Sequence, residues 1–206
     1  LEGARGDYVA KVDDDCLVPD GWYQQIRESH LSNPKLGVVG CWHFLPEDFI
    51  KDVAEKKIID LHGGHRLMVN CWVGGSGYVM KRQCVDEAGS LRENESFSNY
   101  CIRLARMGWL NGWYYPFLYQ DHMDDPRSAH TVLKTDEDLR KYMPLSAQNF
   151  GAATLDQWQA QLRRSAKTLQ GAPTDPRAYS PWRGVLRRWG YRPVAKLFEN
   201  AASRFR

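Results

Sequence analysis

Short apolar runs alternate with longer amphipathic stretches through the first half of the chain. Short apolar runs bounded by glycine, proline or acidic residues are typical of buried strands, and apolar residues spaced three and four positions apart are typical of helices. The predicted strands are residues 9–12, 36–42, 66–72, 77–81 and 113–120. The predicted helices are residues 20–33, 46–59, 82–88 and 96–107. This order favours an α/β fold in which helices flank a mixed sheet.

The pattern changes after Pro126, where helical spacing dominates. The helices predicted in this part are residues 136–143, 154–169, 182–189 and 193–205. A proline-rich break at residues 171–181 separates the second of these helices from the third. The pattern therefore divides the chain into an α/β part, residues 1–130, and a helical C-terminal extension, residues 131–206.

Composition leaves the broad class open between an enzyme and a binding module. The chain has 206 residues, of which 43% are hydrophobic and 26% charged, as is ordinary for a globular protein. No apolar run approaches the roughly 20 residues that a membrane-spanning helix needs. The five cysteines lack a C-x-x-C spacing, which argues against a disulfide framework or a structural zinc site and favours a reducing compartment. We expect a cytoplasmic protein, and because a strand is predicted almost at Leu1, we expect a further region before it.

Basic residues gather at the C-terminal end of the sequence. Residues 181–206 contain seven basic residues and one acidic residue, together with Trp182, Trp189, Phe198 and Phe205. A basic segment with aromatic side chains can bind an anionic membrane surface, here the inner face of the membrane, as a peripheral contact. The alternative is a helix that packs on the domain with a solvated basic face. Nothing besides charge supports nucleic acid as a partner.

The apolar run at residues 9–12 is followed directly by three aspartates, Asp13, Asp14 and Asp15. Adjacent carboxylates repel one another, so a strand end that carries three needs a counter-cation, and a divalent metal is the best candidate. If the strand continues, alternation of side chains puts Asp13 and Asp15 on one face and Asp14 on the other. The alternative is a solvated turn that caps the next helix. The carboxyl end of a strand is, however, where open α/β sheets bind ligands.

An apolar strand that ends in D-x-D and is followed by V-P-D-G-W resembles the inverting glycosyltransferases of family 2, which have the GT-A fold. Three later stretches resemble this family in order and spacing. Residues 74–82 resemble its glycine-rich acceptor-side strand, residues 103–109 the end of its catalytic helix, and residues 119–122 the strand that delivers a late histidine. The resemblance implies a partial GT-A-like domain, because the family's nucleotide-binding half precedes the D-x-D and only a few residues precede it here.

The resemblance also implies roles for the residues around the aspartates. Asp15 and Asp13 would contact the metal. Asp13 would also be directed to the ribose of a nucleotide-sugar donor. His122 is the candidate for a further metal ligand. The cofactor would be Mn²⁺ or Mg²⁺, and a histidine ligand favours manganese. Lys11 could help to hold the donor phosphates. Alternatively, His122 is a hydrogen-bonded histidine in an acidic loop, and Lys11 only offsets the aspartates.

The glycine-rich turn is the candidate acceptor site. Gly75, Ser76 and Gly77 allow a ligand to approach the backbone closely, and the adjacent ring of Trp72 suits the face of a sugar. The alternative for this segment is a plain hairpin turn.

The catalytic base is the least defined part of the site. An inverting transfer needs a carboxylate near the acceptor hydroxyl. The family's catalytic helix begins with Glu-Asp, where this chain has Ser96 and Phe97. Glu95 or Glu93 is the candidate replacement. The alternative for Glu95 is a carboxylate that complements the helix dipole.

The sequence therefore predicts a metal-dependent glycosyltransferase. It would transfer a sugar, with inversion, from a nucleotide-diphosphate donor to a glycan, a lipid-linked intermediate or another carbohydrate acceptor. The main alternative is a catalytically silent subunit that binds a sugar nucleotide or a glycan, which the missing Glu-Asp and the missing nucleotide-binding half favour. A third hypothesis is a metal-dependent phosphoryl or nucleotidyl transferase, against which the sequence offers no P-loop pattern and no arginine cluster near the aspartates.

Overall fold

The computed structural model describes residues 3–179, which fall into two compact units. The first unit is Leu1–Thr174, and the second, Asp175–Arg206, is described only as far as the 3₁₀ helix η4 (Pro176–Tyr179). The helices predicted at residues 182–189 and 193–205, and the whole of the basic segment 181–206, lie outside the described residues. The boundary predicted at residue 130 falls inside the first unit.

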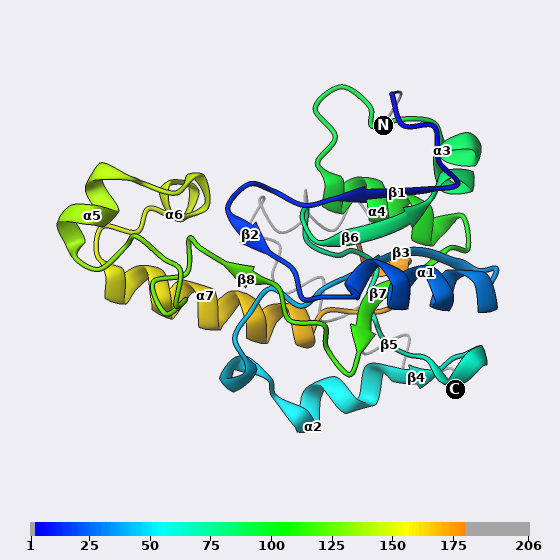
Figure 1. Ribbon diagram of the computed structural model, residues 1–206, viewed down its shortest axis with the longest axis horizontal. Coiled ribbons are helices and arrows are strands. Elements are labelled where there is room, and N and C mark those ends of the chain that lie inside the picture. The colour runs from blue at the N-terminus through cyan, green and yellow to red at the C-terminus, as the bar shows by residue number, and fades with distance from the viewer. Residues whose placement is uncertain (1–2, 180–206) are drawn as a thin grey trace, which may run out of the picture. The chain divides into compact units, whose positions relative to one another are not determined.

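A mixed six-stranded sheet forms the centre of the first unit (Figure 1). In spatial order its strands are β1 (Tyr8–Lys11), β6 (Tyr78–Lys81), β3 (Leu36–Gly40), β7 (Leu110–Tyr115), β5 (Arg66–Val69) and β4 (Ile58–Asp60). The β3–β7 pair is parallel and the other neighbours are antiparallel. The prediction of a mixed α/β fold is confirmed.

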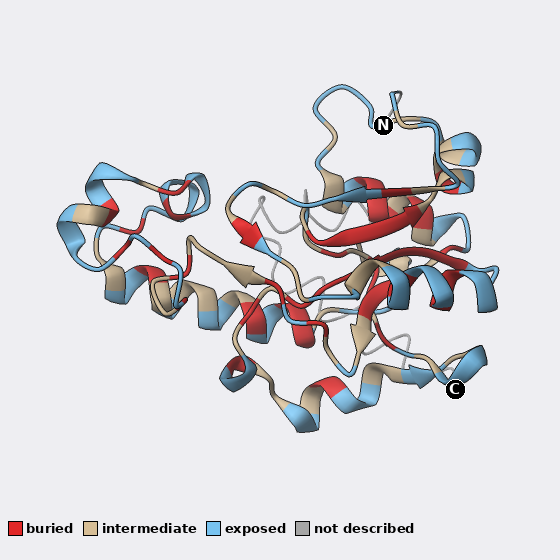
Figure 2. Cartoon of the chain, viewed as in Figure 1, coloured by how far each residue is buried: buried red, intermediate tan, exposed pale blue. Residues whose placement is uncertain are grey.

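Alternation along the strands gives this sheet two apolar faces, and the buried residues follow the central strands (Figure 2). Val38 on β3 belongs to one core and its neighbour Val39 belongs to the other. The first core also takes in side chains of α3 (Arg82–Ala88), α4 (Phe97–Arg106) and the C-terminal end of α7 (Leu155–Gln170). The second core is covered by α1 (Trp22–Ser32) through the fully buried Ile26. Helices therefore pack on both faces of the sheet, as the sequence predicts.

A smaller third core lies among the helices that follow β8 (Asp121–His122). These helices are α5 (Asp136–Lys141), α6 (Leu145–Phe150) and the N-terminal half of α7, which lie together in Figure 1. Its buried residues are Leu133, Leu139, Ala147, Ala152 and Trp158. Because the other end of α7 packs in the core of the sheet through Ala166 and Leu169, this one helix takes part in both cores.

Three details differ from the predicted elements. The predicted helix 46–59 is broken into η1 (Pro46–Asp48), α2 (Lys51–Ala54) and η2 (Glu55–Lys57), and Ile58 and Ile59 form β4 instead. The β-branched pair at 58 and 59 gains cross-strand partners in Leu67 and Met68, which outweighs helical spacing at the end of the segment. The strand predicted at 113–120 begins earlier, at Leu110, and ends at Tyr115, and α6 was not predicted.

The glycine-rich segment 74–77 is not a hairpin turn. It links β5 to β6, which are not neighbours in the sheet. The segment therefore crosses from one part of the sheet to another, past the ends of the strands between them.

The described helices include none that is long and apolar enough to span a bilayer.

Candidate functional site

The three aspartates lie in a turn and not on a strand. β1 ends at Lys11, and the amide of Cys16 donates to the carbonyl of Asp13 at 3.2 Å, closing the turn. The prediction that strand alternation puts Asp13 and Asp15 on one face is therefore wrong, because period-two alternation applies only while the chain is extended. The aspartates do come just after the end of a strand, as predicted, but β1 is a largely exposed edge strand and not the buried strand that was predicted.

A short two-stranded ribbon brings Asp15 to His122. β2 (Cys16–Leu17) pairs antiparallel with β8, so that Cys16 faces His122 across the ribbon. The Nε2 of His122 lies 3.9 Å from the Oδ2 of Asp15. The amide of Met123 also donates to the carbonyl of Asp15 at 2.8 Å. The structure thus brings together two of the three predicted metal ligands, from positions far apart in the sequence.

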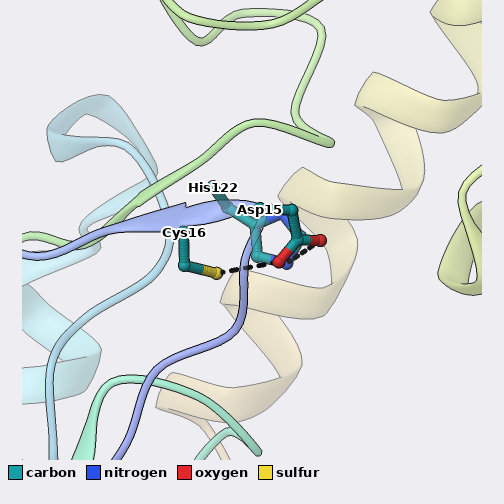
Figure 3. Close-up of side chains that lie close together, drawn as sticks. All are labelled: Asp15, Cys16 and His122. Atoms are coloured by element: carbon teal, nitrogen blue, oxygen red, sulfur yellow. Dashed lines mark hydrogen bonds and ion pairs between the residues drawn. The ribbon is translucent and has the colours of Figure 1, made fainter.

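Cys16 joins this pair to form a group of three possible ligands (Figure 3). Ligand atoms of Asp15, Cys16 and His122 all lie within 4.8 Å of one another. The Cys16 thiol donates to the Oδ1 of Asp15 at 3.3 Å, and burial raises its pKa to about 12, so the thiol keeps its proton at neutral pH. A carboxylate with an imidazole suits Mn²⁺ better than Mg²⁺, which prefers oxygen ligands alone, and the Cys16 thiol would have to lose its proton to become a third ligand. Sequence analysis did not select Cys16, because a lone buried cysteine is ordinary core.

The His122 ring is also contacted on its other nitrogen. The amide of Asp124 donates to Nδ1 at 3.3 Å. A cation held by Nε2 requires the proton on Nδ1, so this long hydrogen bond would have to break on binding. Burial raises the pKa of the Asp124 carboxyl. The nearby Asp15 raises this pKa further, and the nearby His122 lowers it. A second carboxyl therefore lies close to Asp15, which increases the demand for a positive charge there.

Asp13 turns toward Lys11 and the glycine-rich segment. Its Oδ1 lies 2.5 Å from the Nζ of Lys11, and its amide donates to the Oγ of Ser76 at 2.9 Å. Lys11 Nζ also donates to the carbonyl of Gly75 at 3.0 Å. The predicted donor residues and the predicted acceptor segment are therefore in direct contact. Among the described residues, Asp13 does not belong to the group of three possible metal ligands.

A pocket of about 290 Å³ opens beside these residues. One side, which we call the strand-end wall, consists of His122 of β8 and of loop residues near the ends of strands: Asp13, His43, Phe44, Gly74, Gly75, Ser76, Gln120 and Asp125. The other side, the helical wall, comes from α6 and α7: Ser146, Phe150, Trp158, Leu162 and Ser165. Sequence analysis missed the helical wall, because apolar residues at helical spacing cannot be told from core residues by pattern alone.

The charges of the strand-end wall are partly compensated. Burial, together with His122, lowers the pKa of His43 to about 3, so that ring is neutral. The Asp125 carboxylate accepts from Arg127 at 2.9 and 2.7 Å, and the same guanidinium donates to both oxygens of Asp48 at 2.9 and 2.8 Å. Asp125 therefore contributes a fixed carboxylate to the pocket, and its charge is only partly offset because the one guanidinium also binds Asp48.

Of the predicted catalytic and acceptor residues, Gly75 and Ser76 line this pocket, whereas Glu95, Glu93, Trp72 and Gly77 do not line it in the described part of the chain. Glu95 forms an ion pair with Arg103 at 2.7 Å, and this hydrogen-bonded contact lowers the pKa of its carboxyl. Glu93 is exposed, and Trp72 packs edge-on against Trp113 in the core. Glu95 is thus held as a structural partner of α4. This role is close to the alternative interpretation of Glu95 as a structural carboxylate at the end of that helix.

Comparison with protein-family models, with curated proteins and with solved structures found no match to this chain. The site must therefore be interpreted from its own geometry.

Proposed function

We propose that this chain is a metal-dependent glycosyltransferase that takes a sugar from a nucleotide-diphosphate donor and passes it, with inversion, to a carbohydrate or lipid-linked acceptor. We place its action in the cytoplasm, where the five buried cysteines stay as free thiols. The resemblance to family 2 and its GT-A fold is part of this proposal.

One observation carries the proposal. Asp15 and His122 converge through the β2–β8 ribbon, and His122 lines a pocket together with Asp13 and Ser76. A carboxylate and an imidazole from distant parts of the chain, next to a further carboxyl from Asp124, make a cation-binding geometry. This is the arrangement that a donor diphosphate with its cation requires.

The residues of the chain would divide the work as follows. Asp15 and His122 would hold the cation, which when bound offsets the negative charge that grows on the leaving diphosphate. Lys11 is half-exposed, contacts Asp13 and the carbonyl of Gly75, and could turn from them to a phosphate oxygen. The amide of Asp13 donates to Ser76, and its carboxylate contacts Lys11 beside the pocket that Asp13 lines.

A second function is favoured by the state of the predicted base. Glu95 is committed to Arg103 and lies outside the lining of the pocket. Without a carboxylate base near the acceptor hydroxyl, the chain would bind a sugar nucleotide or a glycan without transferring it. Calorimetry that detects nucleoside-diphosphate binding, with no transfer to a broad panel of acceptors, would select this function.

The deciding experiment for the first function is Mn²⁺-dependent hydrolysis of a panel of nucleotide sugars. We expect Asp15→Ala to lower turnover by about 100-fold or more, because it removes a ligand of the cation. Asp14→Ala is the matched control, since Asp14 is the exposed neighbour and does not belong to the described group of possible metal ligands. Equal turnover in wild type and Asp15→Ala would rule out the metal role.

A further inference from the structure

Gln120 is a buried polar residue in the strand-end wall. It comes just before β8, and its amide donates to the carbonyl of Trp42 at 2.8 Å, which fixes its backbone beside the end of β3. The residue is only 3% exposed and is among the residues that line the pocket, although the polar atoms of its side chain are buried. Its position is therefore set by the fold and not by its own side chain.

The carboxamide of Gln120 has no hydrogen-bond partner among the described residues. Both Oε1 and Nε2 are buried and unpaired. The carboxamide does lie near the Cys16 sulfur, where it favours the thiolate slightly, but this contact lacks hydrogen-bond geometry. A buried amide with neither its donor nor its acceptor satisfied costs free energy, and such a group in a native protein needs a reason.

The backbone around Gln120 leaves room for this side chain. A Cβ on Gly77 would lie 1.6 Å from the Oε1 of Gln120, so any larger residue at 77 would displace the carboxamide. Gly77 also has a φ of 62°, which favours glycine independently. The local structure thus accommodates an unpaired amide at this point of the pocket.

We propose that Gln120 is a specificity-determining residue whose carboxamide turns from its buried position over Gly77 into the pocket and binds the hydroxyl groups of a sugar ring there. A carboxamide both donates and accepts, and neighbouring hydroxyls on a ring can satisfy both functions at once. The inference rests on the proposed function, since it names the part of the sugar substrate that the pocket selects.

The opposite wall suits the same ligand. The helical wall has no charged side chain, and it presents the rings of Phe150 and Trp158 together with the hydroxyls of Ser146 and Ser165. Aromatic rings pack on the apolar face of a sugar, while serine hydroxyls and an amide bind its polar edge. An anionic ligand would meet the carboxylates of Asp13 and Asp125 instead. The pocket, at about 290 Å³, is at the lower end of the range for small-ligand sites, on the order of 300–1,000 Å³, and fits one ring better than a long chain.

The test compares wild type with Gln120→Met, which keeps the length of the side chain and removes its polar atoms, and with Gln120→Leu as a second variant. Gln148→Met is the matched control, because Gln148 is exposed on α6 and is not among the described residues that line the pocket. The probes are UDP and GDP with Mn²⁺, then UDP-glucose, UDP-N-acetylglucosamine and GDP-mannose with Mn²⁺, and methyl glycosides of glucose, galactose and mannose alone. Calorimetry measures the nucleotides, and saturation-transfer NMR measures the glycosides.

We expect Gln120→Met to weaken at least one sugar probe by about tenfold or more, because the sugar loses its hydrogen-bonding partner. Binding of the matching nucleoside diphosphate should stay within twofold, as should every probe with Gln148→Met. A loss confined to nucleotide sugars identifies the donor sugar as the ligand of Gln120, and a loss confined to glycosides identifies the acceptor sugar.

The melting temperature of the ligand-free protein separates this role from a structural one. If Gln120 is kept for a ligand, Gln120→Met should melt at the wild-type temperature or above it, because two unpaired buried polar atoms are gone. A lower melting temperature in both Gln120 variants, with equal losses for sugars and for nucleoside diphosphates, would overturn the proposal.

Two other results would overturn it as well: unchanged sugar binding in Gln120→Met, or no sugar probe bound by wild type. If wild type binds UDP or GDP with Mn²⁺ but no sugar, the inference on Gln120 fails while the nucleotide part of the proposed function stands. If wild type binds a sugar through Gln120 without binding any nucleotide, the glycosyltransferase proposal fails and the sugar site remains.

Discussion

The two walls of the pocket are built in different ways. The strand-end wall consists of residues at strand ends whose polar groups are fixed by contacts between distant segments, such as Asp13 to Ser76, and Asp125 through Arg127 to Asp48. The helical wall consists of side chains on two helices and is backed by a small apolar core of its own around Trp158. The charged groups that can perform chemistry thus lie on one side, and a neutral surface that can select shape lies on the other.

This difference indicates that side chains of the helical wall could be substituted while the charged groups of the strand-end wall keep their arrangement. Side chains of the helical wall do not hold the Asp15 and His122 geometry, which depends on the β2–β8 ribbon. One hydrogen bond does join the two sides, because the Nε1 of Trp158 donates to the carbonyl of Asp124 at 2.7 Å. Substitution of Trp158 is therefore the most direct test of whether the two walls are independent of each other.

The largest effect should come from Trp158→Ala. Trp158 is 2% exposed in the third core, and we expect the substitution to lower the free energy of unfolding by about 3–5 kcal/mol. Trp158→Phe, which keeps a ring but removes the N–H donor, should cost about 1 kcal/mol. Urea unfolding of both variants measures these values. A wild-type midpoint for Trp158→Ala would mean that the helical wall does not depend on its own core.

A smaller effect is expected on the strand-end wall. Gly77→Ala should destabilise the protein by roughly 1–3 kcal/mol, because a side chain is strained at its positive φ and would meet the Gln120 carboxamide. Gly75→Ala is the control, since a Cβ there meets nothing within 4 Å. The same unfolding assay applies. If the two variants behave alike, the close packing of Gln120 over Gly77 is not a feature of the folded protein in solution.

The smallest effect on stability should come from Phe150→Ala. Phe150 is 57% exposed, so the free energy of unfolding should change by less than about 0.5 kcal/mol. Binding of a sugar probe should nevertheless weaken several-fold, because Phe150 lines the pocket. Leu145→Ala, on the same helix and 71% exposed, should leave both quantities unchanged, since Leu145 is not among the described lining residues. Equal binding in both variants would remove the helical wall from the ligand site.

Much of the fold could be predicted from hydrophobic pattern, because its central strands are short apolar runs and α1, α4 and α7 have clear helical spacing. The pattern failed where an element depends on distant partners. Ile58 and Ile59 form an edge strand because β5 lies beside them, and nothing within residues 46–59 reveals that neighbour.

The site was predictable only in part, for a related reason. Asp15 and His122 could be selected as residue types that bind cations, and the structure brings them together. Cys16, Gln120 and the helical wall could not be selected, because their place in the site depends on contacts between residues far apart in the chain. In a sequence, a glutamine that the fold will bury without hydrogen-bond partners cannot be told from a surface glutamine.

The β2–β8 ribbon has a consequence for how occupancy of the site can be observed. Two paired strands of two residues each are marginal on their own, so this ribbon should open far more often than the central sheet. A cation that joins Asp15 to His122 binds only the closed ribbon and must slow its opening. Amide hydrogen exchange at Met123, whose N–H is bonded to the carbonyl of Asp15, is therefore a direct gauge of binding, readable even when no sugar is turned over.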